Sequence, residues 1–387
     1  MKKLMFVAAL VPACSWSQFD DLADTTPARA AEKPDGVKAS DYGIQVVGAT
    51  TPSTTSGGTI AVLSTGPGNF STLELDPGGK DQNLGDSETL GQHTIDSLTA
   101  SAQLLFDGAG SIALVDNSNV GTIIAITGNA NGLTVDTQVP TSAHPIGTAF
   151  SNGELVVAVE PMTGMPNVFS VKGTGVVNCT LVDNASMPLA VAAIAIDGTK
   201  LWAYAKSGAF FGYDLSALDM PSTCTNLVPT TAVAMAGAAM NSGHIDVIPG
   251  KFAIVTSFDS ATSTSGAVQV VATSPAVALV GSPVAVAGVR SAAFASLADK
   301  GMVVLGFPNR ADATTTGAGA VDLHAIALDT GVLDATPAQV LTIPNADQNH
   351  LFGRSVTTTS YNGKPIVVAS SSNTVYSYYA TMLYEKR

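Results

Sequence analysis

The chain has 387 residues, of which 46% are hydrophobic and 12% charged, so it can bury a large core. Its formal net charge is −13, and a surface this acidic repels phosphate backbones, which excludes nucleic acid as an expected partner. The apolar residues are mostly Ala and Val, accompanied by 37 Gly and few aromatics. This composition favours many short strands joined by tight turns over long helices.

The first residues have the pattern of an export signal. Lys2 and Lys3 precede a short apolar segment, residues 4–11, and Cys14 follows where a bacterial lipobox places its cysteine. The resemblance implies that residues 1–13 are a lipoprotein signal peptide and that Cys14 carries the acyl chains of a membrane anchor. Ordinary cleavage, with Cys14 discarded or free, is the alternative. Ser15 after the cysteine resembles the sorting signal for the outer membrane, in the cell envelope.

Residues 14–40 are predicted to be a lipidated flexible tether. They are polar, contain two prolines and show no sustained hydrophobic period. Phe19 and Leu22 leave a second possibility, in which this segment adds an outer strand to the folded domain.

Residues 350–379 form the clearest structural unit in the chain. Three short strands are predicted, at residues 352–360, 364–369 and 374–379, separated by turns rich in Asn, Gly and Ser. A meander of this kind cannot bury both faces alone, so copies are expected elsewhere. Six further units begin with a first strand near residues 42, 92, 143, 186, 243 and 289.

Seven units with a period of roughly 50 residues are typical of a β-propeller, which closes on itself and leaves few strand edges. We therefore predict an all-β fold, a seven-bladed β-propeller of four-stranded antiparallel blades, over residues 41–387. The fourth strand of the unit that opens at residue 186 is expected at residues 223–228. The last unit lacks an obvious fourth strand, and we expect residues 382–384 or residues 19–22 to supply it.

Three histidines precede predicted first strands, namely His144, His244 and His350. First strands line the central channel of a propeller, so these side chains are candidate channel-mouth residues, and converging imidazoles can bind a metal. The favoured interpretation is that each histidine caps a turn through a backbone hydrogen bond. No complete catalytic, metal or cofactor motif occurs, so no catalytic residue, metal site or cofactor is predicted.

Cys179 and Cys224 are the cysteines that follow Cys14, and an exported pair favours a disulfide. Both fall on predicted outer strands of consecutive blades. Matching positions on neighbouring blades diverge at the rim, which argues against the bond. The two arguments conflict, and the sequence leaves the pairing open.

Two segments resemble FG-GAP repeats, the blades of integrin-alpha-type propellers. They are Tyr42-Gly43 with Gly48-Ala49, and Phe352-Gly353 with Asn362-Gly363. Together with the lipobox and tether, they are similar to predicted surface lipoproteins of myxobacteria and related groups. That family often has a calcium loop with several carboxylates. Residues 360–364 keep the Asn-Gly turn without a carboxylate, so no calcium is expected there.

The preferred functional hypothesis is a lipid-anchored cell-envelope propeller, a non-enzymatic binding or adhesion module for a protein or glycan partner. A rigid ring with variable loops suits this role. The alternatives are a propeller enzyme, a hydrolase or lyase with a channel site, and a purely structural envelope protein. Arginine is scarce after Arg29, which disfavours an enzyme acting on anionic substrates.

Overall fold

The structure is a computed structural model that describes residues 28–30, 44–49, 59–64, 69–74, 89–94, 103–106, 111–118, 122–129, 132–140, 145–172, 175–218, 224–235, 240–259, 265–311, 315–343, 350–361, 364–371 and 375–380. Within these ranges the chain is almost entirely β, in agreement with the predicted class, and one short 3-10 helix, η2 (Leu215–Leu218), is present. None of the helices in the described part is long and apolar enough to cross a membrane.

The described strands form seven sheets, here called blades 1 to 7 in chain order. Blade 1 contains β2 (Ile44–Ala49), β3 (Thr59–Ser64), β4 (Asn69–Glu74) and β5 (Thr89–Thr94). Blade 2 contains β6 (Gln103–Phe106), β7 (Ser111–Ser118), β8 (Thr122–Asn129) and β9 (Gly132–Pro140). Blade 3 contains β10 (Pro145–Ser151), β11 (Glu154–Val159), β12 (Val168–Lys172), β13 (Gly175–Leu181) and a later segment, β17 (Asn226–Leu227).

The other four blades follow the same plan. Blade 4 contains β14 (Val191–Asp197), β15 (Lys200–Ala205), β16 (Ala209–Asp214) and β18 (Thr231–Ala234). Blade 5 contains β19 (Ser242–Ile248), β20 (Phe252–Phe258), β21 (Gly266–Ala272) and β22 (Ala278–Ala285). Blade 6 contains β23 (Ser291–Leu297), β24 (Lys300–Phe307), β25 (Ala320–Ala327) and β26 (Gln339–Leu341). Blade 7 contains β27 (Val356–Tyr361), β28 (Lys364–Ser370), β29 (Val375–Tyr379) and β1 (Ala28–Ala30).

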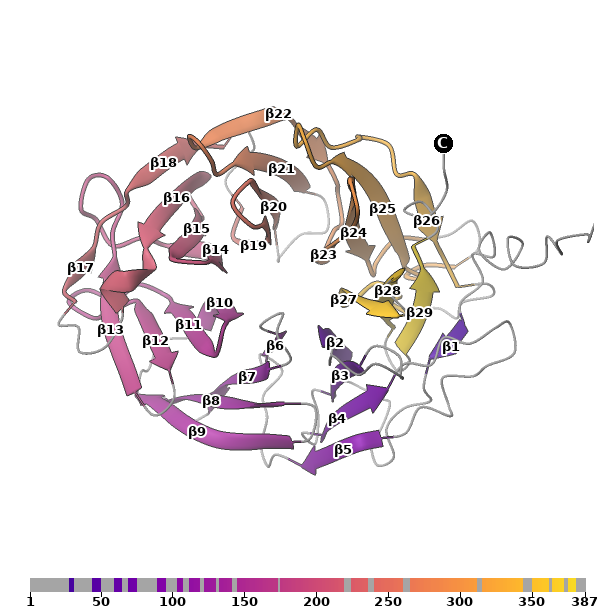
Figure 1. Cartoon of the computed structure of the whole chain (residues 1–387), viewed down its shortest axis with the longest axis horizontal. Coiled ribbons are helices and arrows are strands. Elements are labelled where there is room, and N and C mark those ends of the chain that lie inside the picture. The colour runs from indigo at the N-terminus through magenta and orange to yellow at the C-terminus, as the bar shows by residue number, and fades with distance from the viewer. Residues whose placement is uncertain are drawn as a thin grey trace, which may run out of the picture.

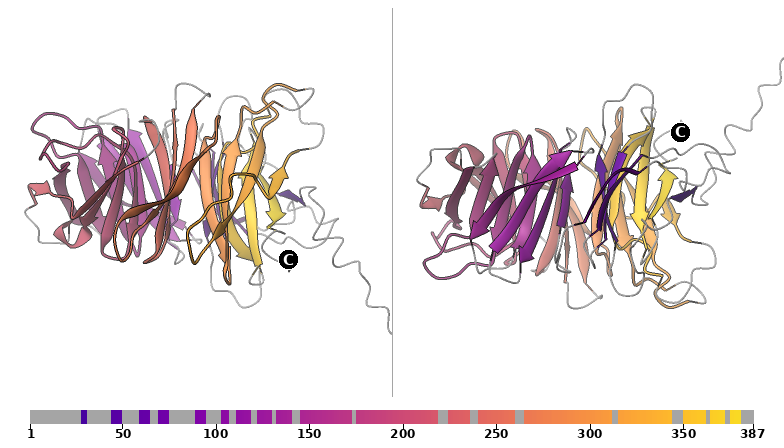
Figure 2. Two further views of the ribbon diagram at one scale, coloured as in Figure 1. Left: turned by 90° about the horizontal axis from the view of Figure 1, so that it is seen from above. Right: turned by 90° about the horizontal axis from the view of Figure 1, so that it is seen from below.

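The blades are arranged radially around a central opening (Figure 1). The innermost strands contact one another in turn, from β2 through β6, β10, β14, β19, β23 and β27 and back to β2. Seen edge-on, the ring is a disc, and the connections between strands gather on its two faces (Figure 2). The fold is therefore the β-propeller that the sequence predicts.

The hydrophobic core lies between successive blades. Side chains on facing surfaces form shared clusters between blades 3 and 4, 4 and 5, 5 and 6, and 6 and 7. The middle strands between these blades are consequently covered on both faces, and β11 and β20 are buried at every position. This double burial explains why both strands are mostly apolar and lack an alternating pattern, although Glu154, Thr256 and Ser257 are buried polar exceptions.

The boundary between blades 1 and 2 differs from the sequence prediction. We expected residues 92–95 to open the second unit, but β5 pairs antiparallel with β4, with His93 opposite Phe70, and completes blade 1. The first strand of blade 2 is β6 instead. An unpaired β4 edge would leave a row of backbone groups without partners, and the next extended segment in the chain satisfies them.

The boundary between blades 3 and 4 also differs. Residues 223–228 were expected to be the outer strand of blade 4, but β17 pairs parallel with β13 of blade 3. The outer strand of blade 4 is β18, which pairs with β16. Leu227 on β17 is buried in the core cluster that contains Cys179 and Leu181, so burial of this leucine stabilises the pairing of β17 with blade 3.

The ring closes through a strand from the N-terminal segment. β1 pairs antiparallel with β29 as the outer strand of blade 7, with Ala28 opposite Ser377. The predicted tether thus contributes a strand at residues 28–30, rather than at residues 19–22, which lie outside the described residues, as do residues 382–384. Blade 7 is built from both ends of the chain, so opening the ring here would break the β1–β29 ladder.

Candidate functional site

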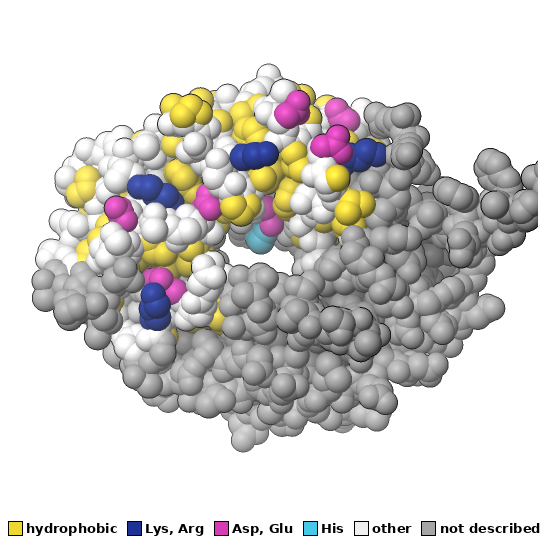
Figure 3. All heavy atoms as spheres, viewed as in Figure 1, with side chains coloured by type: hydrophobic (Ala, Val, Ile, Leu, Met, Phe, Trp, Pro, Cys, Tyr) yellow, Lys and Arg dark blue, Asp and Glu magenta, His cyan; other side chains and the backbone are white. Residues whose placement is uncertain are grey.

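Two polar side chains of β19 lie at the central opening. His244 and Asp246 are two residues apart on the innermost strand of blade 5, so both point to the same side of it. His244 Nε2 lies 3.2 Å from Asp246 Oδ1, and the His244 side chain is 47% exposed. Figure 3 shows a histidine beside an acidic side chain at the opening, where β19 lies in Figure 1.

The pKa of His244 is raised above its usual value of 6.5. Desolvation by the surrounding blades is the largest single influence and lowers this pKa, but the charge and the hydrogen bond of Asp246 together outweigh it. Asp246 Oδ2 is buried and has no hydrogen-bond partner among the described residues. The pair can hold a proton and bind a small polar group. Within the described residues, no group of three or more His, Cys, Asp or Glu side chains could hold a metal ion.

The structure does not bring His350 beside His244. His350 Nε2 lies 3.0 Å from the Tyr376 hydroxyl, on the third strand out from the opening, whereas His244 is on an innermost strand. His350 therefore packs within blade 7 rather than beside His244, and the expectation of a shared channel-mouth position is wrong for this residue. His144 lies outside the described residues, immediately before β10. Cys14 lies outside them as well.

Cys179 and Cys224 are joined by a disulfide with Cα atoms 5.2 Å apart. The objection from diverging blades does not apply, because the segment that contains Cys224 belongs to the rim of blade 3. Thr180 N donates to Thr225 O, and Val182 N donates to Leu227 O, which aligns this segment with β13. The bond therefore links two neighbouring segments of one blade.

A second site lies on the loops of blade 3. Four side chains, called here the methionine surface, are large, apolar and exposed: Met162, Met165, Met187 and Val228, at 46%, 56%, 62% and 57%. They come from the β11–β12 loop, the β13–β14 connection and the residue after β17. β11 and β13 run in the same direction, and β17 is parallel to β13. All four side chains therefore lie on the same face of the ring.

Proline and glycine give the β11–β12 loop its shape. Met165 N donates to Met162 O at 3.1 Å, and Gly164 has a φ of +74°, which is the geometry of a tight turn with glycine at its third position. Pro161 and Pro166 flank this turn and restrict the backbone on both sides. Met162 and Met165 are the first and last residues of this turn.

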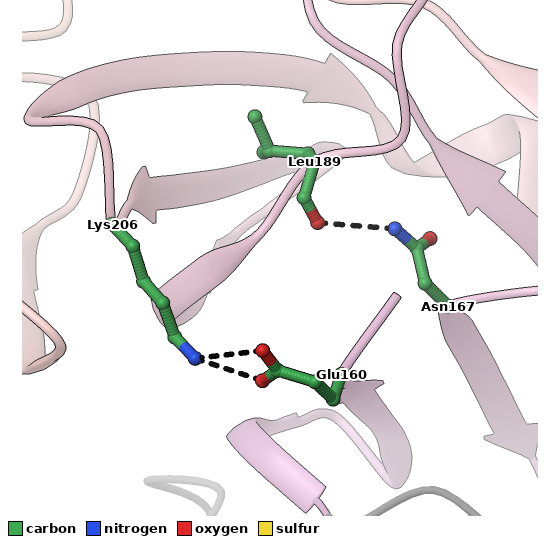
Figure 4. A network of polar contacts seen from close by, with 4 residues as sticks. All are labelled: Glu160, Asn167, Leu189 and Lys206. Atoms are coloured by element: carbon green, nitrogen blue, oxygen red, sulfur yellow. Dashed lines mark hydrogen bonds and ion pairs between the residues drawn. The ribbon is translucent and has the colours of Figure 1, made fainter. Parts of the chain in front are cut away.

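One buried amide ties this loop to the β13–β14 connection. Asn167 is fully buried, and its Nδ2 donates to Leu181 O at 3.2 Å and to Leu189 O at 3.1 Å. Its Oδ1 accepts from Leu181 N at 2.6 Å. Figure 4 shows the Asn167–Leu189 contact. The bases of both methionine-bearing segments are thus held side by side.

Charged groups border the methionine surface. Glu160 accepts from Lys206 Nζ at 2.8 and 3.1 Å, which links the loops of blades 3 and 4 (Figure 4). Asp183 Oδ1 accepts from Ala185 N and Met187 N at 2.8 and 2.9 Å, which fixes the turn that carries Met187. Charged groups therefore lie on the same loops as the exposed apolar side chains.

Our sequence reasoning missed the methionine surface because it searched for titratable residues and metal motifs. The sequence nevertheless contains a pattern that could have indicated these exposed methionines. Pro161-Met162, Met165-Pro166 and Met187-Pro188 place three methionines beside prolines within two short segments. Methionine is usually buried, and proline marks surface turns, so this pairing indicates exposed thioethers.

No protein-family model and no curated protein matches this sequence. Among solved structures, a chain of a mitotic checkpoint complex superposes with a TM-score of 0.54 at 12% identity, covering 92% of this chain and 96% of that chain. The WD40 β-propeller domain of Doa1 superposes with a TM-score of 0.52 at 13% identity, covering 90% of this chain and 96% of that chain. At these identities the likeness establishes the propeller fold alone.

Proposed function

We propose that this protein is a non-enzymatic binding module whose methionine surface docks a protein partner. The observation that carries the proposal is the grouping of Met162, Met165, Met187 and Val228 on one face, on loops that are already fixed by hydrogen bonds. Exposed apolar groups gathered within a polar border are typical of protein interaction sites. Methionine suits such sites because its flexible, polarisable side chain adapts to a partner.

The rigidity of the backbone below these side chains also supports docking. Binding costs free energy when loops and side chains must be ordered. Here the turn at Gly164, the amide of Asn167 and the carboxylate of Asp183 fix the loops in the unbound protein. A protein partner fits this surface better than a glycan, because the exposed atoms are apolar and offer few donors and acceptors.

The central opening gives weaker support to an enzyme. His244 and Asp246 form one proton-holding pair, and a hydrolase also needs a nucleophile or an activated water and groups that stabilise developing charge. The fold neighbours include a WD40 domain and a chain of a mitotic checkpoint complex, which is an assembly of proteins. A binding role is the simpler interpretation for this chain.

We also propose a cellular location for this protein. The export signal and Cys14 support a lipid-anchored protein of the outer membrane, related to the FG-GAP-type propeller lipoproteins that the sequence resembles. The Cys14→Ala variant should leave the membrane fraction for the soluble fraction. If the variant stays in the membrane fraction, the lipid anchor is refuted.

Site-specific crosslinking tests the docking surface. A photoreactive residue at Thr163, exposed between the two methionines of the turn, should form one discrete crosslinked product on intact cells. The same residue at Asp329, in the β25–β26 connection on the opposite face, should not. Met165→Asp should abolish the product, whereas Val332→Asp, at an exposed valine of that opposite face, should retain it. Equal crosslinking from both faces, or a product that survives Met165→Asp, would refute the proposal.

A further inference from the structure

We propose that the thioether sulfurs of Met162, Met165 and Met187 form a binding site for a soft monovalent cation, Cu(I) or Ag(I). The site uses three residues of the methionine surface, but it depends on their sulfur atoms rather than on their apolar area. It does not rest on the proposed protein partner.

The exposure of these three methionines is selective. Among the described residues, Met240 and Met302 are buried, and Met235 is partly buried against a core cluster. Methionine normally fills gaps in a core, where its sulfur contacts apolar atoms. In the described part of the chain, the exposed thioethers are all found on the two adjoining segments of blade 3.

The backbone brings the three residues together. Met162 and Met165 are the first and fourth residues of a hydrogen-bonded turn, which places their Cα atoms within about 7 Å. Met165 is two residues before Asn167, and Met187 is two residues before Leu189. Asn167 Nδ2 donates to Leu189 O at 3.1 Å, so the two segments are joined two residues from Met165 and two residues from Met187. Long, unbranched side chains can span the remaining gap.

Soft-metal chemistry matches this ligand set. Thioether sulfur is a neutral, polarisable donor that favours Cu(I) over Mg²⁺ or Ca²⁺, which prefer oxygen. A thioether carries no proton at any ordinary pH, so binding displaces none. Cys179 and Cys224 are joined in a disulfide and therefore offer no competing thiolate.

The electrostatic surroundings favour a cation. Glu160 lies two residues before Met162, and its charge is balanced by Lys206 at 2.8 Å. The Asp183 carboxylate, which accepts from the backbone of Met187, therefore supplies the net negative charge beside the site. The chain as a whole has a formal net charge of −13. A bound monovalent cation thus sits in a negative field without a buried counter-ion of its own.

The test uses Ag(I), which has the softness of Cu(I) and is not oxidised in air. The full-length chain is prepared with Cys14→Ala, so that no free thiol at that position binds silver, and with the disulfide intact. Silver nitrate is titrated in chloride-free buffer while the methyl resonances of ¹³C-labelled methionine are recorded. We expect one Ag(I) per chain, with three methionine methyl signals shifting together.

Isosteric variants separate the sulfur from the apolar surface. Met162→Leu, Met165→Leu and Met187→Leu should each weaken Ag(I) binding at least ~10-fold, and the triple variant should abolish it. Met302→Leu, at a buried methionine of β24 in blade 6, should bind as the parent does. Retention of one-to-one binding by the triple variant, or no shift in the parent at micromolar Ag(I), would overturn the inference.

The same variants keep this test independent of the proposed function. Leucine preserves the apolar surface, so the triple Met→Leu variant should still form the Thr163 crosslink while losing silver. If the crosslink is absent from the parent but silver binds, the docking proposal fails and the metal site stands.

Discussion

Asn167 allows the most direct test of how the methionine surface is held. Its side chain makes three hydrogen bonds, to Leu181 O, Leu189 O and Leu181 N, at 3.2, 3.1 and 2.6 Å, and it is completely buried. A hydrogen bond contributes about 0.5–1.5 kcal/mol net, and a buried group that is left unpaired costs about 1–3 kcal/mol. The Asn167→Ala variant should therefore lose about 3 kcal/mol of unfolding free energy.

Two further substitutions sharpen this test. Asn167→Asp keeps the shape and the acceptor for Leu181 N but turns an oxygen toward two carbonyls, so it should destabilise the protein more than alanine does. Asn178→Ala, at an exposed position of β13, is the matched control and should change the free energy by less than about 0.5 kcal/mol.

Urea unfolding followed by circular dichroism measures these differences, and amide hydrogen exchange reports on the loop itself. The Met165 amide, which donates to Met162 O, should exchange faster in Asn167→Ala than in the parent. If Asn167→Ala unfolds at the same urea concentration as Asn178→Ala, the amide does not hold the two segments together. The preorganisation argument for both proposals then fails.

Three further changes probe other parts of the ring. Gly306→Ala should destabilise the protein by about 1–3 kcal/mol in urea unfolding, because the new Cβ would meet a backbone carbonyl of blade 7; a neutral result would contradict this close contact. Replacing Cys179 and Cys224 together by alanine should cost about 4 kcal/mol from loop-closure entropy across 45 residues, measured in the same way; an unchanged midpoint would refute it. Asp246→Asn should lower the pKa of His244, as measured by NMR titration, and an unchanged pKa would exclude this pairing. In the parent, the protonated pair should stabilise the fold fully below pH 6.5, and this stabilisation should disappear as the pH rises through the raised pKa of the folded state.

The strands were largely predictable because their apolar runs are local. β11, β20 and β28 are short β-branched segments bounded by turn residues, and each is a middle strand buried on both faces. The arrangement of outer strands was not predictable in the same way. An outer strand is chosen by which extended segment reaches a free edge, and β1 has only three residues, Ala-Arg-Ala, with no hydrophobic pattern. Its role follows from ring closure, which is a property of the whole chain.

The candidate site was less predictable than the fold because a surface depends on which loops become neighbours. Met162 and Met187 are 25 positions apart in the chain. The hydrogen bonds of Asn167 hold the two segments together, and they cannot be inferred from the presence of an asparagine in a proline-rich loop. The position of a histidine side chain depends on its neighbours in the same way. His350 precedes β27 and His244 lies near the start of β19, yet one packs on Tyr376 and the other faces the opening.

The junction of blades 3 and 4 combines several independent constraints. The Cys179–Cys224 disulfide attaches β17 to blade 3, the buried Asn167 joins two loops, and Glu160 pairs with Lys206 across the blades. The ion pair is exposed and contributes at most about 1 kcal/mol, so the disulfide and the amide hold most of the geometry. β17 is also the segment that carries Val228 to the methionine surface. The pairing of β17 with blade 3 thus matters for binding. It adds the exposed Val228 side chain to one face of the ring, and the disulfide holds this segment in place. A partner or a metal ion that binds there meets side chains whose backbone is already ordered, so less of its binding free energy is spent on ordering the loops.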